Sequence, residues 1–400
     1  MNQLAIDGGT PIRTKAFPQW PVYGEMEERL LLEVLRSGKW GGSTPDKLKQ
    51  LEAKFAEIHG AAYAVSVING TVGITVALQA AGVRSGDEVI MPPYTFIATA
   101  TSSLLFGAIP VFADVEEDTL QLDPEKVEAA ITPRTKAIVT VHIGGASSNM
   151  TRLKEIADRH HLRLIEDSAQ AVGAQWEGKG VGSLGDLGTF SFQSSKNVNS
   201  GEGGMILTND KDLADMAWSL TNVGRIREGA WYQHEHIGWN LRMTEFQGAV
   251  LLGQLSRLDE QLAVRERNGG LLTELLSETE GIEVLRRDPR ITRHAYHLYM
   301  FKLAPELAES VDKNDVIAKI AAEGIPVSAG YVSLNLNKAV LNEIERWTGS
   351  KPSYSCPISE KLSSKQAIWV HQNALLAEES DMHDIAAAVK KVVHSLKIKN

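Results

Sequence analysis

Residues 162–170 read Leu-Arg-Leu-Ile-Glu-Asp-Ser-Ala-Gln, a short apolar run that ends in Glu166 and Asp167. A run of this length bounded by polar residues is typical of a buried strand, and a helical pattern over 150–161 precedes it. Parallel sheets bind their ligands at the carboxyl ends of their strands. Asp167 is therefore a candidate functional residue, although in isolation a helix cap or a solvated turn is the simpler explanation for it.

The alternation of strand and helix extends in both directions from this stretch. β-rich runs occur at 63–67, 88–91, 109–113, 137–141, 163–166 and 189–192, and helical patterns fill most of the gaps, at 71–81, 95–106, 124–131 and 150–161. Alternation at this spacing indicates an α/β fold with a mainly parallel sheet covered by helices.

The two ends of the chain differ from this central part. Residues 1–23 are irregular and rich in Gly, Pro and aromatic residues, which indicates an arm lying on a surface, and a helix is expected over 25–37 because Gly38 follows it. Long helices are expected over 211–270, followed beyond Glu280 by a strand-like run at 296–303 and helical patterns at 311–323 and 381–396. These patterns predict a large domain over 1–274, which includes the arm, and a smaller α+β C-terminal domain over 275–400.

The composition of the chain excludes several classes of protein. Its 400 residues suggest two or three domains at about 150 residues each, and the net charge of −9 argues against a nucleic-acid partner. No apolar run of about 18 residues appears, and residues 1–20 lack the pattern of a secretory signal. A single cysteine excludes a disulfide framework and a multi-cysteine zinc site, and His234-Glu235-His236 lacks a third metal ligand. We expect a soluble cytoplasmic protein without a metal or membrane partner.

A polar loop after the last predicted strand contains a second candidate residue, Lys196. Period-2 alternation puts Phe190 and Phe192 on one face of that strand and Ser191 on the other. A solvated surface lysine is the ordinary explanation for Lys196. A lysine can also form a Schiff base with an aldehyde cofactor, provided that its pKa falls from about 10.4 or that a proton acceptor lies nearby. A carboxylate such as Asp167 would then hold a pyridinium nitrogen protonated and make the ring an electron sink.

Two further strand ends offer binding groups. Residues 65–72 read Val-Ser-Val-Ile-Asn-Gly-Thr-Val, which predicts a strand, a turn and the start of a helix. The N–H groups at such a helix start bind phosphate, to which Ser191, Ser194 and Ser195 add hydroxyls. Residues 91–96 read Met-Pro-Pro-Tyr-Thr-Phe and place aromatic rings where a flat ligand could stack. A plain capped helix and ordinary core packing are the alternatives.

Together these segments resemble the sugar aminotransferases of the DegT/StrS type, a family of fold type I pyridoxal-phosphate enzymes with an aspartate-aminotransferase-like fold. The resemblance covers nearly the whole chain, from the Gly8-Gly-Thr-Pro11 arm to the final helix. Its most specific parts are Glu166-Asp-Ser-Ala-Gln-Ala-Val-Gly-Ala174 and Phe190-Ser-Phe192, Ser195-Lys-Asn197 and Gly203-Gly204.

The resemblance implies a role for each matching residue. Lys196 would be catalytic, carrying the cofactor as a Schiff base and moving a proton between substrate and cofactor carbons, and Asp167 would pair with the pyridinium nitrogen. The other implied contacts with pyridoxal 5'-phosphate are made by Gln170 near the ring oxygen, by Phe96 stacked on the ring, by Gly70, Thr71, Val72 and Ser191 around the phosphate, and by Asn240 at the phosphate of the neighbouring subunit of a homodimer with shared active sites.

The resemblance predicts an aminotransferase that moves an amino group from L-glutamine or L-glutamate to a scyllo-inosose-like keto cyclitol or a keto sugar, by ping-pong chemistry at Lys196. The Gly8–Arg13 arm and Trp369-Val-His371 are similar to the branch that acts on cyclitol ketones and makes aminohydroxybenzoate. The alternatives are a nucleotide-diphosphate-keto-sugar aminotransferase, an aminohydroxybenzoate-synthase-like dehydratase, and a non-catalytic regulator. The N-terminal arm, Arg225 or Arg227, and Tyr331 are expected near the acceptor from their positions. The alternative for Arg225 and Arg227 is that both are solvated loop residues.

Overall fold

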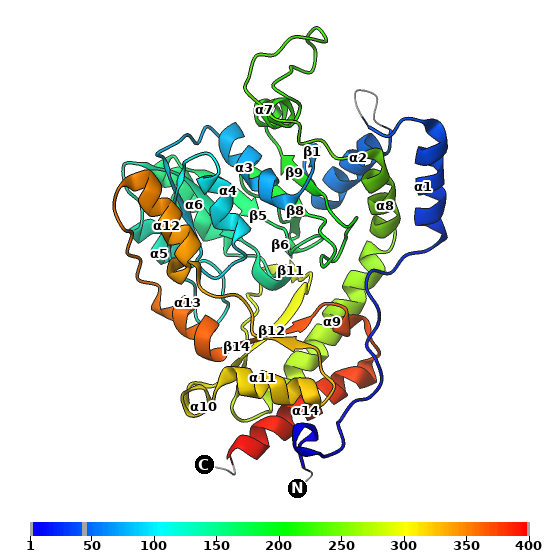
Figure 1. Cartoon of the computed structure of the whole chain (residues 1–400), viewed down its shortest axis with the longest axis vertical. Helices are drawn as coiled ribbons and strands as arrows, with labels where there is room; N and C mark the ends of the chain where they lie inside the picture. The colour runs from blue at the N-terminus through cyan, green and yellow to red at the C-terminus, as the bar shows by residue number, and fades with distance from the viewer. Residues whose placement is uncertain (1–2, 42–45, 398–400) are drawn as a thin grey trace.

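A seven-stranded sheet lies at the centre of the computed structural model, which describes residues 3–41 and 46–397 (Figure 1). Its order is β1-β9-β8-β5-β4-β2-β3, with β1 (Tyr63–Val67), β2 (Glu88–Met91), β3 (Ile109–Phe112), β4 (Thr135–Val141), β5 (Arg163–Asp167), β8 (Leu187–Ser191) and β9 (Gly204–Thr208). Paired strands are parallel except that β9 is antiparallel to both β8 and β1. The mainly parallel sheet is thus confirmed, and β9 is a strand that the sequence analysis does not predict.

Helices cover both faces of this sheet. They are α2 (Lys47–His59), α3 (Gly70–Ala80), α4 (Ala98–Leu104), α5 (Pro124–Ala129), α6 (Met150–His160) and α7 (Lys211–Thr221), while α1 (Glu25–Ser37) packs on α8 (Glu245–Leu255) at one side (Figure 1). Successive strand residues point to opposite faces, so Ile138 and Leu164 enter one hydrophobic cluster while Val139 and Ile165 enter another. The sheet is therefore buried on both faces, and its strand ends are left for polar groups.

A second, four-stranded antiparallel sheet follows in the C-terminal part. It consists of β10 (Ile282–Val284), β12 (Leu298–Leu303), β14 (Ala367–His371) and β13 (Val327–Ser328). Its core is shared with α9 (Leu258–Ser277), α11 (Lys313–Ala322) and α14 (Glu379–Lys397). The remaining elements here are α10 (Pro305–Ser310), α12 (Lys338–Thr348) and α13 (Pro357–Lys361), and a small sheet joins β11 (Ile291–Arg293) to β6 (Gln175–Trp176) and β7 (Lys179–Gly180). This arrangement matches the expected smaller α+β part.

The two parts of the chain are interleaved at several points. Helix α9 runs across residue 275. In the arm, Leu4 shares the core of the second sheet, and Arg13 forms an ion pair of 2.6 Å with Asp381 of α14. Conversely, Val340 of α12 packs into the cluster of the first sheet. The division into domains at 274/275 therefore stays a prediction.

The expectation of long helices over 211–270 is wrong for the middle of that segment. Residues 222–244, between α7 and α8, form an irregular loop that projects from the molecule (green, Figure 1). Val223 and Gly224 are in the left-handed region at φ 55° and 81°, and a Cβ on Gly238 would lie 2.7 Å from the Leu220 carbonyl oxygen. These backbone requirements interrupt the helix. None of the helices that the structure describes combines the length and apolarity needed to cross a membrane.

Candidate active site

A cavity of about 620 Å³ opens at the carboxyl ends of β4 and β5, beside the start of α3. It brings together most of the residues predicted to bind or act, namely Gly70, Thr71, Phe96, Asp167, Gln170, Ser191 and Lys196. The second sheet closes the cavity. It contributes Leu298 at the start of β12, His297 just before it, and Trp369 and His371 of β14. The strand ends singled out in the sequence thus meet at one enclosed site.

Asp167 and Lys196 both face this cavity, and burial disfavours the charged form of each side chain. The Asp167 carboxylate is buried, and it accepts hydrogen bonds from Thr99 Oγ1 at 2.9 Å and from the N–H of Ala169 at 3.2 Å. Burial raises the pKa of Asp167, and the hydrogen bond from Thr99 offsets only part of that effect. Burial also lowers the pKa of Lys196 to about 8, against the opposing pull of the Asp167 charge. The pair therefore combines a carboxylate that forms no ion pair with any described residue and an amine that loses its proton readily.

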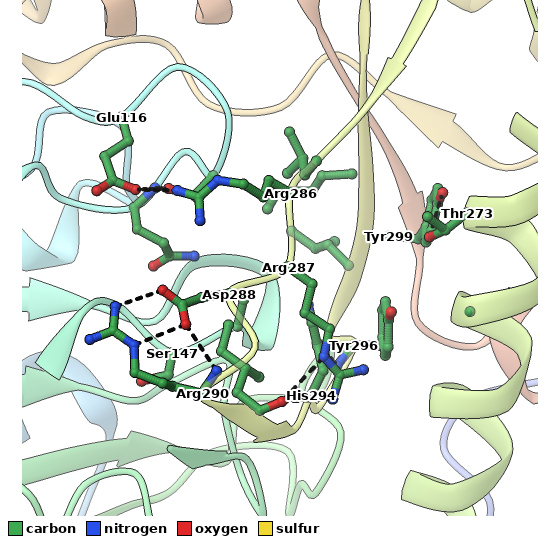
Figure 2. Close-up of a pocket in the computed structure, with 18 of the residues that line it drawn as sticks. Glu116, Ser147, Thr273, Arg286, Arg287, Asp288, Arg290, His294, Tyr296 and Tyr299 are labelled. Carbon is green, nitrogen blue, oxygen red and sulfur yellow. Dashed lines mark hydrogen bonds and ion pairs between the residues drawn. The ribbon is translucent and has the colours of Figure 1, made fainter. Parts of the chain in front are cut away.

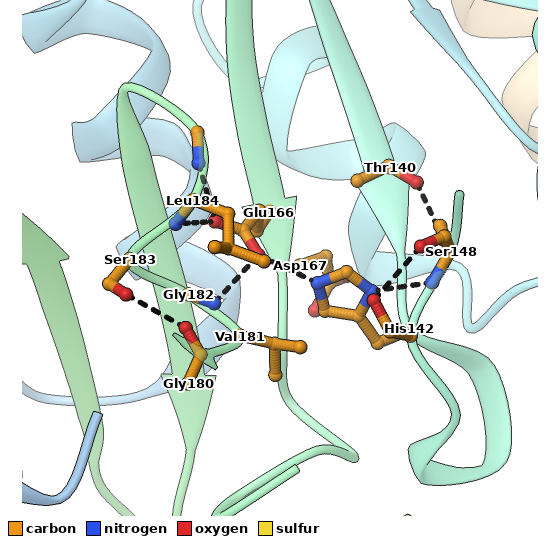
Figure 3. Close-up of polar contacts among 12 residues, drawn as sticks. Thr140, His142, Ser148, Glu166, Asp167, Gly180, Val181, Gly182, Ser183 and Leu184 are labelled. Atoms are coloured by element: carbon orange, nitrogen blue, oxygen red, sulfur yellow. Dashed lines mark hydrogen bonds and ion pairs between the residues drawn. The ribbon is translucent and has the colours of Figure 1, made fainter. Parts of the chain in front are cut away.

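Glu166, the other acidic residue of the opening stretch, points away from the cavity. Its carboxylate accepts hydrogen bonds from the N–H groups of Gly182, Leu184 and Gly185 and from His142 Nε2 at 2.9 Å (Figure 3). His142 Nδ1 accepts the N–H of Ser148 at 3.0 Å, so its proton lies on Nε2. Burial would raise the pKa of Glu166, but these donors lower it overall. Glu166 is thus a structural carboxylate that holds the turn at 182–185 against the strand carrying Asp167.

We expect the substitution Glu166→Gln to lower the free energy of unfolding by about 3 kcal/mol, because the amide places an N–H₂ group among buried donors. The pKa of Glu166 is lower in the folded state, so its stabilisation is complete above the unfolded pKa and is lost as the pH falls through the folded pKa. Denaturant unfolding at neutral and acidic pH checks both points. Glu155→Gln, at an exposed ion pair on α6, is the control, and equal stability of the two variants would contradict this role.

The start of α3 forms a cradle for an anion. The Asn69 side chain accepts the N–H of Val72 at 3.0 Å, which leaves the N–H groups of Gly70 and Thr71 without a partner within the helix. A Cβ on Gly70 would lie 2.8 Å from Cβ of Ser191, so glycine is needed for the close approach of α3 to β8. Gly70, Thr71 and Ser191 line the cavity, whereas Val72 does not, and its N–H is already used by Asn69.

The substitution Gly70→Ala should weaken binding of pyridoxal phosphate by about tenfold or more, because the added methyl group displaces Ser191 and widens the cradle. Equilibrium dialysis or titration of the apoprotein measures this affinity. Gly270→Ala is the matched control, since a Cβ there meets nothing within 4 Å. Equal affinity in the two variants would show that the phosphate group binds elsewhere.

One wall of the cavity is built around Gln170. Its Oε1 accepts the N–H of Gly144 at 2.7 Å, and its Nε2 donates to the hydroxyl of Tyr331 at 2.9 Å. Phe96 is 55% exposed, and its ring centroid lies 6.1 Å from that of Tyr331. Helix α4 begins at Ala98 rather than at Thr95, so Phe96 stands in the loop that faces the cavity. An exposed aromatic ring beside a polar wall suits the stacking of a flat ligand.

Several predicted residues lie outside this cavity. Asn240 is exposed on the projecting loop, where it pairs with Asn222. Arg227 forms an ion pair with Asp215 at 3.1 Å, and Arg225 Nε donates to the carbonyl oxygen of Trp231. Of the three hydroxyls suggested for phosphate, Ser191 and Ser195 line the cavity, whereas Ser194 does not.

Other residues line the cavity although the sequence does not predict them as part of the site. They are Asn69, Thr95, Glu202, His297, Ser328, Trp369, His371 and Gln372. Most come from loops or from the second sheet, and only the fold brings them to the strand ends. Trp369 and His371 are the exception, because their segment shows the family resemblance and signals a role.

The residues of the cavity fit pyridoxal phosphate. Asp167 is a buried carboxylate that forms no ion pair within the described part of the chain, Lys196 is an amine with a lowered pKa, and the cradle at Gly70 suits an anion. A pyridinium nitrogen, an aldehyde and a phosphate group match these three features one for one. Phe96 and Gln170 supply the walls between them.

Comparison with known proteins agrees with this geometry. The L-glutamine:2-deoxy-scyllo-inosose aminotransferase of Streptoalloteichus tenebrarius is 40% identical over 414 residues, covering 98% of this chain and 97% of the relative. The 3-amino-5-hydroxybenzoate synthase of Amycolatopsis mediterranei is 36% identical and covers 94% of this chain and 97% of the relative. The crystal structure of a 3-amino-5-hydroxybenzoic acid synthase matches with a TM-score of 0.87 and 35% identity over 96% of this chain and 100% of that chain. The family model described as DegT/DnrJ/EryC1/StrS aminotransferase family matches residues 21–390. The chain belongs to the DegT/DnrJ/EryC1/StrS aminotransferase family.

Proposed function

We propose that this aminotransferase moves the amino group of L-glutamine to a keto cyclitol of the scyllo-inosose type, with Lys196 and Asp167 as its catalytic residues. The observation that carries the proposal is the enclosure of Lys196, with its lowered pKa, in one cavity with the buried carboxylate of Asp167. Relatives about 40% identical over nearly the whole chain are named for L-glutamine and 2-deoxy-scyllo-inosose. Those names support both the donor and the acceptor.

Each residue contributes a separate part of the chemistry. Pyridoxal phosphate supplies, when bound, an electron sink for the charge that develops on a substrate carbon. Lys196 Nζ would take the proton from the donor carbon and pass it to the cofactor carbon, and in the second half-reaction it would move a proton from the cofactor carbon to the acceptor carbon. Asp167 keeps the proton on the ring nitrogen, and the N–H groups of Gly70 and Thr71 hold the phosphate. Gln170 and Tyr331, which both line the cavity and are joined by a hydrogen bond of 2.9 Å, fix one of its walls.

A second candidate function is a dehydration that forms an aromatic amine or acid. It is favoured by the relative and the solved structure that are named as 3-amino-5-hydroxybenzoate synthases. The two functions differ in the fate of nitrogen, because only amino transfer moves nitrogen from the donor to the product.

The quaternary part of the proposal is a homodimer with shared active sites. The projecting loop 222–244 carries Trp231, Tyr232 and Ile237 with exposed fractions of 77%, 76% and 90%. Large apolar side chains exposed this close together are typical of an interface. Asn240 follows them on the same loop and in a dimer would reach the phosphate site of the partner subunit.

Isotope transfer tests the function. The holoprotein is incubated with L-glutamine labelled with ¹⁵N at the α-amino group and with 2-deoxy-scyllo-inosose, and the product is analysed by mass spectrometry. We expect the label in a cyclitol amine. An unlabelled aromatic product would favour the dehydratase, and an unchanged ketone would contradict amino transfer to this acceptor.

The lowered pKa of Lys196 predicts the pH dependence of cofactor capture. Only the neutral amine attacks an aldehyde, so the capture rate of the apoprotein should rise about tenfold per pH unit in acid and level off above the Lys196 pKa of about 8. An ordinary lysine, with a pKa of 10.5, would show no plateau at that pH. Stopped-flow absorbance measures the rate, and a profile that rises without a break through neutral and mildly alkaline pH would contradict the lowered pKa.

A further inference from the structure

Arg265 of α9 is a fully buried guanidinium without a carboxylate partner among the described residues. Its Nε and Nη2 both donate to Oε1 of Gln372, at 3.1 and 2.6 Å, and its buried Nη1 has no hydrogen-bond partner. Burial lowers the pKa of Arg265 to about 9. A buried charge left unpaired is costly, so its retention requires an explanation.

Three arginines line a second cavity of about 410 Å³, and unlike Arg265 each of them is paired with a carboxylate (Figure 2). Arg287 is paired with Glu266 at 2.6 Å and Arg290 with Asp288 at 2.8 Å. Arg286 is likewise paired with Asp118. Each of these three arginines is therefore neutralised by a carboxylate, whereas Arg265 forms no ion pair with any described residue.

Arg265 lies close to the catalytic lysine. The Arg265 guanidinium carbon sits 5.3 Å from the centroid of the Trp20 ring, and Nε1 of the same ring donates to the carbonyl oxygen of Lys196 at 3.2 Å. After burial, the charges of Lys196 and Arg265 both lower the pKa of His297, which lines the cavity. The N-terminal arm thus seals Arg265 beside the active site.

Gln372 connects this charge to the cavity. Its Oε1 must face Arg265 because guanidinium nitrogens only donate, so the orientation of the amide is determined by its partner. Gln372 is 4% exposed and lines the cavity, and its Nε2 makes no hydrogen bond within the described part of the chain. An N–H₂ donor, polarised by a cation behind it, is therefore presented to whatever occupies the cavity.

We propose that Nε2 of Gln372, backed by the charge of Arg265, binds the α-carboxylate of the amino donor. The proposal deepens the function given above and rests on it. An anion compensates Arg265 electrostatically, whereas the hydroxyls of a keto cyclitol are neutral and leave its charge unpaired. The cofactor phosphate is accounted for by the cradle at Gly70, and the carboxylates that line the cavity within the described residues are Asp167 and Glu202. Gln372 is a donor-specificity residue, and Arg265 is the positioning residue behind it.

The test compares L-glutamine with 4-aminobutanamide, which is the same molecule without its α-carboxylate. Single-turnover bleaching of the holoenzyme gives a rate for each amine, and the amine form of the enzyme with the keto cyclitol gives the acceptor rate. We expect Gln372→Met to reduce the preference for L-glutamine over 4-aminobutanamide by about tenfold or more. Gln372→Glu should reduce it further, because its carboxylate pairs with Arg265 and repels the donor.

Gln366→Met is the matched control, since Gln366 is also buried, donates to the Leu303 carbonyl oxygen and does not line the cavity. Arg265→Lys, which keeps the charge and loses the double hydrogen bond, should fall between wild type and Gln372→Met. An unchanged preference in the folded Gln372 variants, or an equal loss with the acceptor, would overturn the inference. Failure of wild type to react with any amino acid would instead contradict the proposed function.

Discussion

Replacement of Lys196 by alanine is expected to abolish amino transfer, with turnover reduced by about four orders of magnitude. Lys196 is the lysine that lines the cavity within the described residues, and its pKa of about 8 makes its amine available near neutral pH. Among the described residues, no second amine lines the cavity to hold the cofactor covalently or to move a proton at the reacting carbon. Turnover with L-glutamine, measured on protein saturated with pyridoxal phosphate, checks the effect.

Lys313→Met is the control for Lys196→Ala. Burial lowers the pKa of Lys313 to about 8 as well, but its Nζ donates to the carbonyl oxygens of Ala329 and Ser363, and it does not line the cavity. Lys313→Met should therefore lower stability and leave the folded enzyme active. Substantial turnover in Lys196→Ala would contradict the role of Lys196.

The substitution Asp167→Asn should lower turnover by about a thousandfold. Asparagine has nearly the same shape and can keep the contact with Thr99 Oγ1, which is 2.9 Å in length, but a neutral amide cannot hold a proton on the ring nitrogen. Steady-state turnover and the visible spectrum of the reconstituted variant test this. Asp158→Asn, at an exposed ion pair on α6, controls for loss of a carboxylate elsewhere.

The substitution Asp167→Asn should not lower the stability of the apoprotein, although it lowers turnover. Burial raises the pKa of Asp167 in the folded state, so the folded protein binds this proton more tightly than the unfolded chain does. The ionised carboxylate therefore destabilises the fold increasingly as the pH rises from the pKa of Asp167 in the unfolded chain to its higher pKa in the folded protein. Apo Asp167→Asn should be at least as stable as wild type at neutral pH. A variant that loses stability and activity together would show that Asp167 has a structural role instead.

The common direction of the strands that carry the site explains why so much of it could be predicted from the sequence. Asp167 ends a buried strand and Gly70 begins a helix after β1. Because β9 is antiparallel to both β1 and β8, β1 runs in the same direction as β8 and β5, and the ends of these strands lie at one edge of the sheet. Lys196 follows β8, the neighbour of β5, for the same reason. Local periodicity and one topological rule therefore suffice for these residues.

The remaining residues depend on contacts that leave no local pattern. Arg265 lies within a long helix and Gln372 directly after β14, 107 positions along the chain, and their hydrogen bonds appear only in the folded molecule. The irregular loop 222–244 follows from backbone approaches at Gly224 and Gly238, which helical propensity does not report. The position of Asn240 relative to a partner subunit stays a prediction, because it concerns contacts beyond a single chain.

The visible spectrum of the holoprotein before and after addition of L-glutamine tests whether Lys196 carries the cofactor and whether L-glutamine is the amino donor. We expect an absorption band from pyridoxal phosphate bound to Lys196, which bleaches on addition of L-glutamine as the amino group passes to the cofactor. A band that persists with both L-glutamine and L-glutamate, or no band at all after the cofactor is supplied, would contradict it.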